Sequence, residues 1–406
     1  MDLRLSDKHS ALKAEVETFI ARYGAEAPKA GGGRKRPDVR TLDWQKRLVE
    51  QGYAARTVPR AYGGYGAALD VVELAVIADA FAQAGVPPGL SSQGISMLVP
   101  TLLEVGTEAQ RREWIAPTIR GDVIWCQGYS EPGAGSDLAA VQTRAEPRDG
   151  HFLVNGQKIW TSSAHYADMM FLLCRTDPDR PKHQGLSYLL VSMKTPGIEV
   201  RPLRTMTGRA EFNETFFTDV QVPAENIVMG RGQGWHVANI TLKHERLMLT
   251  DSNRLTQRLQ RLIEMLQRIE IDGRKLMAIP SFRDRLLQLQ GEVLAWRAHG
   301  LRLLTDQATG VDSGLRRLIG KYGATMLCFR LSSLAADALG AAGLPYEVES
   351  ETVEGDEATT WYVDHFYDIG LIIGGGSSNI QKNIIGERGL GLPREPKTND
   401  LAAGRN

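Results

Sequence analysis

The chain has 406 residues and carries 48 Lys and Arg residues against 48 Asp and Glu residues, so its formal net charge is zero. This balance offers no electrostatic reason to expect binding to nucleic acid or to a membrane surface. The three cysteines, Cys126, Cys174 and Cys328, are widely spaced. They predict neither a disulfide framework nor a zinc site, and they suit a reducing compartment.

The length predicts two or three packed units rather than one compact core. The first residues, M-D-L-R-L-S-D-K, lack a basic segment followed by an apolar one. No run of about 18 apolar residues occurs, which is the length that a membrane-spanning helix needs. We therefore expect a soluble, cytoplasmic protein without a secretory signal or a membrane span.

The first unit is predicted to be helical and to end at residue 122. Apolar residues at helical spacing predict helices over residues 6–23, 43–51, 71–85, 92–106 and 108–119. Ser6 and Asp7 are candidate caps of the first helix.

From residue 123 onward the pattern changes to short apolar or alternating runs separated by Gly, Pro, Asp and Asn, which predicts an antiparallel β unit. The expected strands cover residues 124–129, 151–160, 169–175, 186–192, 198–203 and 214–222. Helical periodicity returns from Trp235, over residues 235–270, 281–306, 313–340 and 360–387. The predicted domains are therefore 1–122, 123–234 and 235–406.

One acidic segment interrupts the last part. Residues 347–357 read E-V-E-S-E-T-V-E-G-D-E, with six acidic residues in eleven positions. We expect a solvated loop between helices, and an acidic docking site for a partner is the alternative.

The stretch from Gln127 to Ser163 carries the chemistry. It begins Q-G-Y-S-E-P-G-A-G-S-D-L and ends N-G-Q-K-I-W-T-S-S. Glycines let backbone N–H groups approach a bound anion, and Ser130 and Ser136 can add side-chain donors. The pair Asn155-Gly156 predicts a turn, after which Trp160 and the hydroxyls that follow it would lie along a strand. Together these features suit a flat heterocycle that bears phosphates.

These two stretches and the ending S-S-N-I-Q-K-N-I-I-G-E-R-G-L-G-L-P resemble the acyl-CoA dehydrogenase family over nearly the whole chain. The resemblance implies an α+β fold with a helical N-terminal domain, a central antiparallel β-barrel-like domain and a C-terminal helical bundle. It also implies FAD as the cofactor, an acyl-CoA thioester as the substrate and an electron-transfer flavoprotein as the electron acceptor. The implied reaction needs a base for the α-proton, a flavin for the β-hydride and donors to the thioester oxygen.

The resemblance also implies roles for individual residues. Cofactor-binding roles fall on Tyr129 (through its backbone), Ser130, Gly135, Ser136, Trp160, Ser162, Ser377 and Asn379. Substrate-binding roles fall on Ser136, Arg246, Gly375 and Gly376. Ser130 and Trp160 would contact the flavin ring, and Ser162 would donate to the flavin nitrogen that receives hydride. A helix N-cap is the alternative role of Ser377 and its neighbours.

The catalytic base is where this sequence departs from many relatives, because Gly375 occupies the position at which they carry a glutamate. A second family arrangement places the base on an earlier helix in an E-R pair, which matches Glu245-Arg246 here. Helical spacing puts Glu245 on one face with apolar neighbours, and costly desolvation there suits a general base. Asp364 and Asp368 are weaker candidates for the base.

A second departure concerns assembly. The family usually carries an R-x-x-F-G element whose arginine reaches the FAD of a neighbouring subunit. The stretch here reads R-I-E-I-D-G-R-K-L, with Arg268 and Arg274 but without the aromatic residue and its glycine. Either a hetero-oligomer with a second acyl-CoA dehydrogenase-like chain or a homo-oligomer follows. The alternatives to the dehydrogenase are a flavin-dependent monooxygenase on the same fold and a non-catalytic partner subunit.

Overall fold

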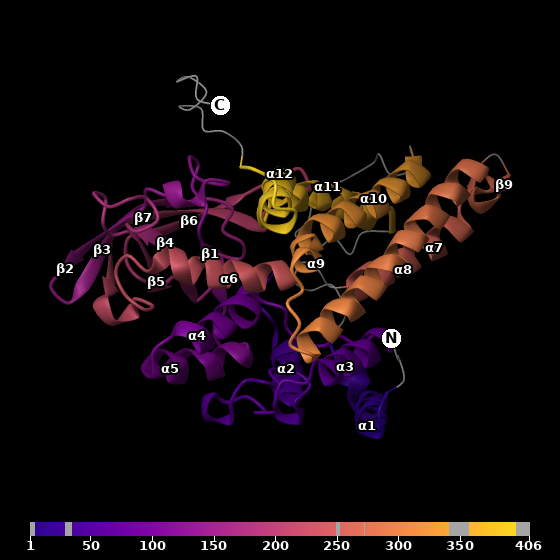
Figure 1. The fold of residues 1–406 in the computed structure, drawn as a ribbon, viewed down its shortest axis with the longest axis horizontal. Helices are drawn as coiled ribbons and strands as arrows, with labels where there is room; N and C mark the ends of the chain where they lie inside the picture. The colour runs from indigo at the N-terminus through magenta and orange to yellow at the C-terminus, as the bar shows by residue number, and fades with distance from the viewer. Residues whose placement is uncertain (1–4, 29–34, 249–251, 272, 341–356, 395–406) are drawn as a thin grey trace, which may run out of the picture. The chain divides into compact units, whose positions relative to one another are not determined.

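The computed structural model describes residues 5–28, 35–248, 252–271, 273–340 and 357–394 (Figure 1). These residues form two compact units, one made of the described residues up to Met248 and one made of those from Ser252 onward. The predicted acidic loop at 347–357 lies outside the described residues except for Glu357. No helix in the described ranges is long and apolar enough to cross a membrane.

The first unit begins with the predicted helices. They are α1 (Asp7–Tyr23), α2 (Val39–Gln51), α3 (Val71–Gln83), α4 (Val99–Val105) and α5 (Glu108–Ile119), with a π-helical turn at Gly94–Leu98 before α4. The second helix starts four residues earlier than predicted because the Asp38 side chain caps it by accepting from the Thr41 amide.

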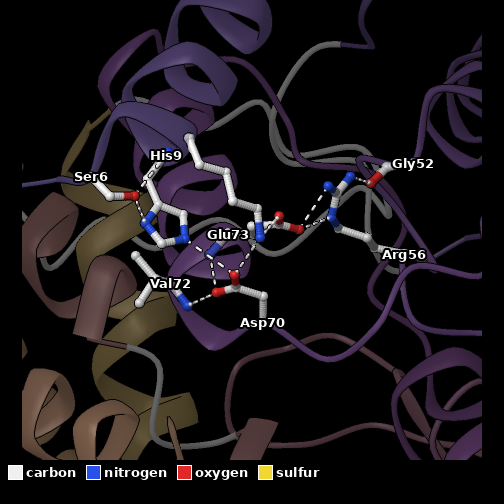
Figure 2. A network of polar contacts seen from close by, with 8 residues as sticks. Ser6, His9, Gly52, Arg56, Asp70, Val72 and Glu73 are labelled. Carbon is white, nitrogen blue, oxygen red and sulfur yellow. Dashed lines mark hydrogen bonds and ion pairs between the residues drawn. The ribbon is translucent and has the colours of Figure 1, made fainter.

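A polar network joins the starts of α1 and α3, and Figure 2 shows it from close by. Lys8 Nζ lies 2.9 Å from Asp70 Oδ2 and 2.7 Å from Glu73 Oε1. Asp70 also caps α3 and lies 3.2 Å from the His9 ring, while Arg56 donates to Glu73 at 2.9 Å. The side chains of Asp70 and Glu73 are mostly buried, so this network ties two helices together through charge as well as packing.

A seven-stranded sheet follows. Its strands are β1 (Trp125–Gly128), β2 (Arg144–Arg148), β3 (His151–Lys158), β4 (Met169–Arg175), β5 (Leu186–Ser192), β6 (Ile198–Leu203) and β7 (Phe212–Pro223). The strand order is β1-β4-β2-β3-β7-β6, and β5 pairs with β4. The pairings β2–β3, β3–β7, β4–β5 and β6–β7 are antiparallel, as expected. In contrast, β1 and β2 both run parallel to β4, so the sheet is mixed.

The turn predicted at Asn155-Gly156 is wrong, because β3 runs straight through this pair. The backbone passes it as an irregularity in the β3–β7 register between Val154 and Gly156. A Cβ at Gly156 would lie 2.8 Å from the Thr143 Cα, so close packing of β2 on β3 accounts for the glycine. The β2–β3 connection lies instead at Asp149-Gly150, and β2 itself was missed by the sequence analysis.

The first unit closes with α6 (Gly234–Met248), which packs against β5, α4 and the π-helical turn (Figure 1). The shared core joins the helices to one sheet face, with Leu98, Leu102, Trp125, Phe171 and Tyr188 fully buried. The sheet's other core is lined by β-branched and aliphatic side chains such as Val154, Val191 and Val220. This arrangement places the end of α6 in the same compact unit as the loop after β1.

The second unit is helical, as predicted. Its elements are α7 (Ser252–Arg268), β8 (Glu270–Ile271), β9 (Arg274–Lys275), α8 (Pro280–Ala308), α9 (Leu315–Leu318), α10 (Gly320–Leu339), α11 (Glu357–Ile373) and α12 (Ser378–Ile384). A π-helical turn at Ile385–Gly389 follows α12. Leucines of α7, α8 and α10 surround the fully buried Trp361. The helix predicted over 235–270 is two helices here, α6 and α7.

Candidate active site

The loop after β1 is a tight, internally bonded turn. Glu131 and Ala134 exchange two backbone hydrogen bonds of 3.0 Å each. The amide of Ile159, just beyond β3, donates to the Ser130 carbonyl oxygen at 2.9 Å. The two halves of the predicted cofactor motif are therefore held side by side by main-chain contacts.

A buried ion pair locks this loop to the sheet, and the sequence analysis missed it. Lys158 Nζ lies 2.8 Å from Glu131 Oε1 and donates to the Tyr129 carbonyl oxygen at 2.9 Å. The Glu131 carboxylate also accepts from the amides of Gln142 and Thr143, at 2.6 and 2.8 Å. Burial works to raise the pKa of Glu131, but the charge of Lys158 and these donors outweigh it and hold the pKa below its usual value. The sequence signal is that Lys158 has the same parity along β3 as the buried Phe152 and Val154, a position where a charge needs a buried partner.

Trp160 follows Lys158 by two residues and has an unusual backbone conformation. Its φ is 61°, in the left-handed region that a bulky residue avoids, and its side chain is 54% exposed. The indole packs edge-on against Phe212 with ring centroids 5.8 Å apart. Backbone strain of about 1–3 kcal/mol persists only where the surroundings enforce it, and it concentrates at ligand-binding positions. An exposed, fixed indole face is a suitable wall for a flat heterocycle.

Strand β7 enforces the backbone around Trp160. The Thr161 amide donates to the Asn213 carbonyl oxygen at 3.0 Å, and the Asn213 side-chain amide returns a bond to the Thr161 carbonyl oxygen at 2.9 Å. Both Thr161 and Asn213 are fully buried, whereas Ser162 is only partly buried. The segment is therefore fixed at Thr161 and presents Trp160 and Ser162 on either side of it.

The glycines of the loop are not required by the protein's own packing. A Cβ at Gly133 or Gly135 would meet no atom within 4 Å, and neither glycine has a positive φ. Ser136 beside them is exposed, and Ser130 is partly buried. Open space over two glycines and flanking hydroxyls fits the close approach of a phosphate-bearing ligand. The residues present thus fit the FAD that the family resemblance implies.

Glu245 lies on the last turn of α6, partly buried, and one helical turn after the fully buried Thr241. Nε2 of the preceding His244 lies 2.7 Å from a carboxylate oxygen of Glu104 on α4, and this hydrogen bond, which the carboxylate accepts, anchors this end of the helix. Leu242 packs against the core, as its place on the apolar face predicts. The side chains of residues 246–248, including Arg246, are outside the part of the chain that the structure describes.

The other predicted site residues belong to the second unit. The Ser377 hydroxyl accepts from the Ile380 amide at 3.3 Å and so caps α12, as the alternative reading proposed. Gly375 and Gly376 have φ values of 65° and 89°, which disfavours any other residue at either position. Lys321, with its side chain buried, donates to the Gly376 carbonyl oxygen at 2.8 Å and fixes the turn. Asn379 is exposed.

The two weaker candidates for the base lie in an ion-pair cluster of the second unit. Arg258 donates to both carboxylate oxygens of Asp368, at 3.1 and 2.5 Å, and Ser332 adds a bond of 2.7 Å. Asp364 lies 3.7 Å from Arg258 and 3.6 Å from Arg261. Asp368 is fully buried, and a carboxylate held by a bidentate arginine is the geometry of a strong, charge-assisted ion pair.

The stretch that replaces R-x-x-F-G forms the two-residue strands β8 and β9. Glu270 and Lys275 face each other across them, with Lys275 Nζ 2.6 Å from Glu270 Oε1. Arg274 is exposed at this hairpin, and Arg268 ends α7. An ion pair between Glu270 and Lys275 therefore joins the two short strands that stand in place of the R-x-x-F-G element.

Family profiles match three successive parts of the chain. The matches are "Acyl-CoA dehydrogenase, N-terminal domain" over residues 6–122, "Acyl-CoA dehydrogenase, middle domain" over 126–220 and "Acyl-CoA dehydrogenase, C-terminal domain" over 232–390.

Individual relatives agree with these profiles. Acyl-CoA dehydrogenase IpdE1 of Mycobacterium tuberculosis is 38% identical over 360 residues, covering 87% of this chain and 88% of the relative. The solved Tcur3481–Tcur3483 steroid ACAD matches with a TM-score of 0.80 and 27% identity, over 97% of this chain and 100% of that one. The ChsE4–ChsE5 complex of Mycobacterium tuberculosis matches with a TM-score of 0.78 and 28% identity, over the same shares. The chain therefore belongs to the acyl-CoA dehydrogenase family, with the α+β fold that the resemblance implied.

Proposed function

We propose that this chain catalyses the FAD-dependent α,β-dehydrogenation of an acyl-CoA thioester to the trans-2-enoyl-CoA. The observation that carries the proposal is the strained, half-exposed Trp160 beside a loop of open glycines, in one compact unit with a carboxylate at the end of α6. Family membership supplies the reaction class.

The residues of the chain divide the work as follows. Glu245 takes the α-proton of the thioester as general base. Bound FAD supplies the two-electron acceptor for the β-hydrogen, which leaves as hydride. Trp160 walls the flavin ring, Ser130 and Ser162 donate to its edge, and the amides around Gly135 and Ser136 hold its phosphates. Ser136 and Arg246 are proposed to contact the substrate. The family resemblance assigns substrate contacts to Gly375 and Gly376 and cofactor contacts to Ser377 and Asn379, and we keep these roles as part of the proposal.

Glu245→Gln tests the reaction most directly, because it keeps the size and hydrogen bonding of the side chain and removes the base. The measurement is anaerobic flavin reduction by an acyl-CoA in the absence of NADPH. Loss of general-base catalysis lowers such a rate by roughly 10²–10⁴-fold. Reduction of the variant within about threefold of the wild-type rate would place the base elsewhere. Bleaching of the wild-type flavin without oxygen or NADPH also separates the dehydrogenase from a monooxygenase.

A bulky, ring-bearing acyl group is the substrate class that we propose. One structural neighbour is a steroid ACAD, and glycines at 374–376 remove side-chain bulk where other members carry a glutamate. A panel of short, long, branched and steroid-derived acyl-CoA thioesters, assayed with an artificial acceptor, tests this. A preference for short straight chains would contradict it.

We further propose an electron-transfer flavoprotein as the natural acceptor, tested by its reduction in a coupled assay.

Assembly with a second, non-identical acyl-CoA dehydrogenase-like chain is the quaternary arrangement that we propose. The neighbours include a complex named for two chains, ChsE4 and ChsE5, and this chain lacks the R-x-x-F-G element. Expression alone is then expected to give flavin-poor protein, and co-expression with the partner to restore the flavin. A stable, active and fully yellow homo-oligomer would contradict this arrangement.

A further inference from the structure

The side chain of Tyr129 has no role in the proposed reaction so far, although its surroundings are unusual. Tyr129 follows β1 and is 5% exposed, with its ring edge-on to Phe171 and to Tyr188 at centroid distances of 6.0 and 6.3 Å. Its hydroxyl oxygen is buried and has no hydrogen-bond partner among the described residues. A buried hydroxyl without a partner costs about 1–3 kcal/mol, so its retention calls for an explanation.

A chain of buried hydroxyls lies beside it, and its protons can be assigned. The Thr101 hydroxyl donates to the Met97 carbonyl oxygen at 2.7 Å, which uses its only proton. The Thr241 hydroxyl lies 3.0 Å from the Thr101 hydroxyl and 3.1 Å from the Val237 carbonyl oxygen, so its only proton is used by one of these two acceptors. The 3.4 Å contact between Tyr188 and Thr241 in turn requires Tyr188 to donate to Thr241.

Tyr129 is then the hydroxyl of this cluster that has no acceptor within hydrogen-bond distance among the described residues. Burial raises the pKa of Tyr129 well above its ordinary value, and the negative charge of Glu245 contributes to the same shift. The group therefore stays a protonated donor at every working pH, within electrostatic range of the Glu245 carboxylate. Thr241 and Glu245 are one turn apart on α6, so the hydroxyl cluster and the base share a helix face.

We propose that the Tyr129 hydroxyl is a positioning donor for Glu245, holding its carboxylate ionised and turned toward the substrate. The inference rests on the proposed role of Glu245 as the base. A hydrogen bond to the charged form of a carboxyl group lowers its pKa, which keeps the base ready to accept a proton. Tyr129 would thus join the flavin loop to the base, since its carbonyl oxygen already accepts from the buried Lys158.

Other ionisable groups face this end of α6. Glu104 of α4 lies 2.7 Å from His244 and 3.5 Å from Lys243, and Tyr188 comes from β5. All of these groups are unchanged in a variant that removes only one hydroxyl oxygen, so Tyr129→Phe isolates the proposed donor.

The matched pair Tyr129→Phe and Tyr188→Phe tests the inference. Each variant removes one buried hydroxyl from the same aromatic cluster, but only Tyr129 is proposed to serve Glu245. The first measurement is the pH dependence of anaerobic flavin reduction. Tyr129→Phe should move the midpoint of the acidic limb upward by about one pH unit, while Tyr188→Phe leaves it in place. Equal midpoints in Tyr129→Phe and wild type, or equal shifts in both variants, would overturn the inference.

A second measurement does not depend on turnover. Infrared difference spectra between acidic and neutral pH follow the carboxyl band of Glu245, which Glu245→Gln identifies by its absence, in the free holoenzyme and with an enoyl-CoA bound. An upward shift of its midpoint in Tyr129→Phe supports the inference even if no acyl-CoA reduces the flavin, in which case the proposed reaction alone fails. An unmoved band in both states overturns the inference while leaving the reaction intact. Thermal unfolding supplies the folding control, because removing an unpaired buried hydroxyl should not lower the Tm.

Discussion

The ammonium group of Lys158 lies 2.8 Å from the Glu131 carboxylate, and the two side chains are 0% and 8% exposed. This pair fixes the loop after β1 against the end of β3, and with it the segment that carries Trp160. Breaking a buried ion pair by removing one partner leaves an uncompensated charge, which is far more costly than losing a surface pair.

We expect Lys158→Met to destabilise the protein by about 3–5 kcal/mol and to reduce flavin occupancy. The reason is that the Glu131 carboxylate would stay buried without its cation, and the loop would lose a donor to the Tyr129 carbonyl oxygen. Lys182→Met is the matched control, because Lys182 pairs with Asp137 on the surface with both side chains at least half exposed. Urea unfolding and the flavin-to-protein absorbance ratio measure both effects. Equal losses in the two variants would contradict the role of the buried pair.

Trp160→Ala should lower flavin occupancy while changing the unfolding free energy of the flavin-free protein by less than about 1 kcal/mol. The side chain is 54% exposed and its backbone is strained, so the fold gains little from it. Leu69→Ala removes another exposed apolar side chain, 61% exposed, from the same unit and should leave the flavin content unchanged. Full occupancy with an unaltered flavin spectrum in Trp160→Ala would remove this residue from the cofactor site.

The network at the starts of α1 and α3 makes a prediction about acid stability. The hydrogen bond from Lys8 is the main cause that holds the pKa of Asp70 well below its usual value, and it lowers the pKa of Glu73 as well. A carboxyl group with a lowered pKa in the folded state stabilises the fold above its unfolded pKa of about 4. That contribution is lost as the pH falls below this value.

Asp70→Asn keeps the helix cap but removes this charge, so it should cost about 1 kcal/mol at pH 7. The difference from wild type should shrink steadily below about pH 4, because Asp70 takes up a proton in the unfolded wild-type chain while it stays ionised in the folded protein. Thermal unfolding between pH 2 and pH 7 measures it. Asp38→Asn, at an exposed cap bonded only to Thr41 within the described residues, should show a smaller change. A difference that stays constant with pH would rule out the charge as its cause.

Asp368→Asn and Asp364→Asn should separate stability from catalysis in the second unit. Asp368 is fully buried in its bidentate bond with Arg258, so we expect its loss to cost about 3–5 kcal/mol. Asp364 is 27% exposed and more distant from both arginines, so its loss should cost less than about 1 kcal/mol. Neither change should remove the base, and flavin reduction by Asp364→Asn should match wild type. A defect like that of Glu245→Gln in this variant would reassign the base.

Much of this protein could be predicted from local sequence. Helical periodicity located α1, α3, α5 and α8 closely, because the period of apolar residues reflects which face of a helix is buried. The loop motif and the Glu245-Arg246 pair could be located because they resemble family motifs in the order of their residues, which needs no knowledge of the fold. The family followed from the same motifs.

Tertiary structure decided what depends on contacts between distant residues. A strand's sequence does not specify its partner, so β1 pairs in parallel with β4, and Asn155-Gly156 continues a strand because β7 and Thr143 pack against it. Lys158 and Glu131 are polar residues whose burial follows only from the loop folding back on the sheet. That the buried Tyr129 hydroxyl has no acceptor could be recognised only from the fold, because Thr101, Thr241 and Tyr188 come from three separate elements. Hydrogen bonds and ion pairs require atoms within a few ångströms of each other, and only the complete fold sets those distances.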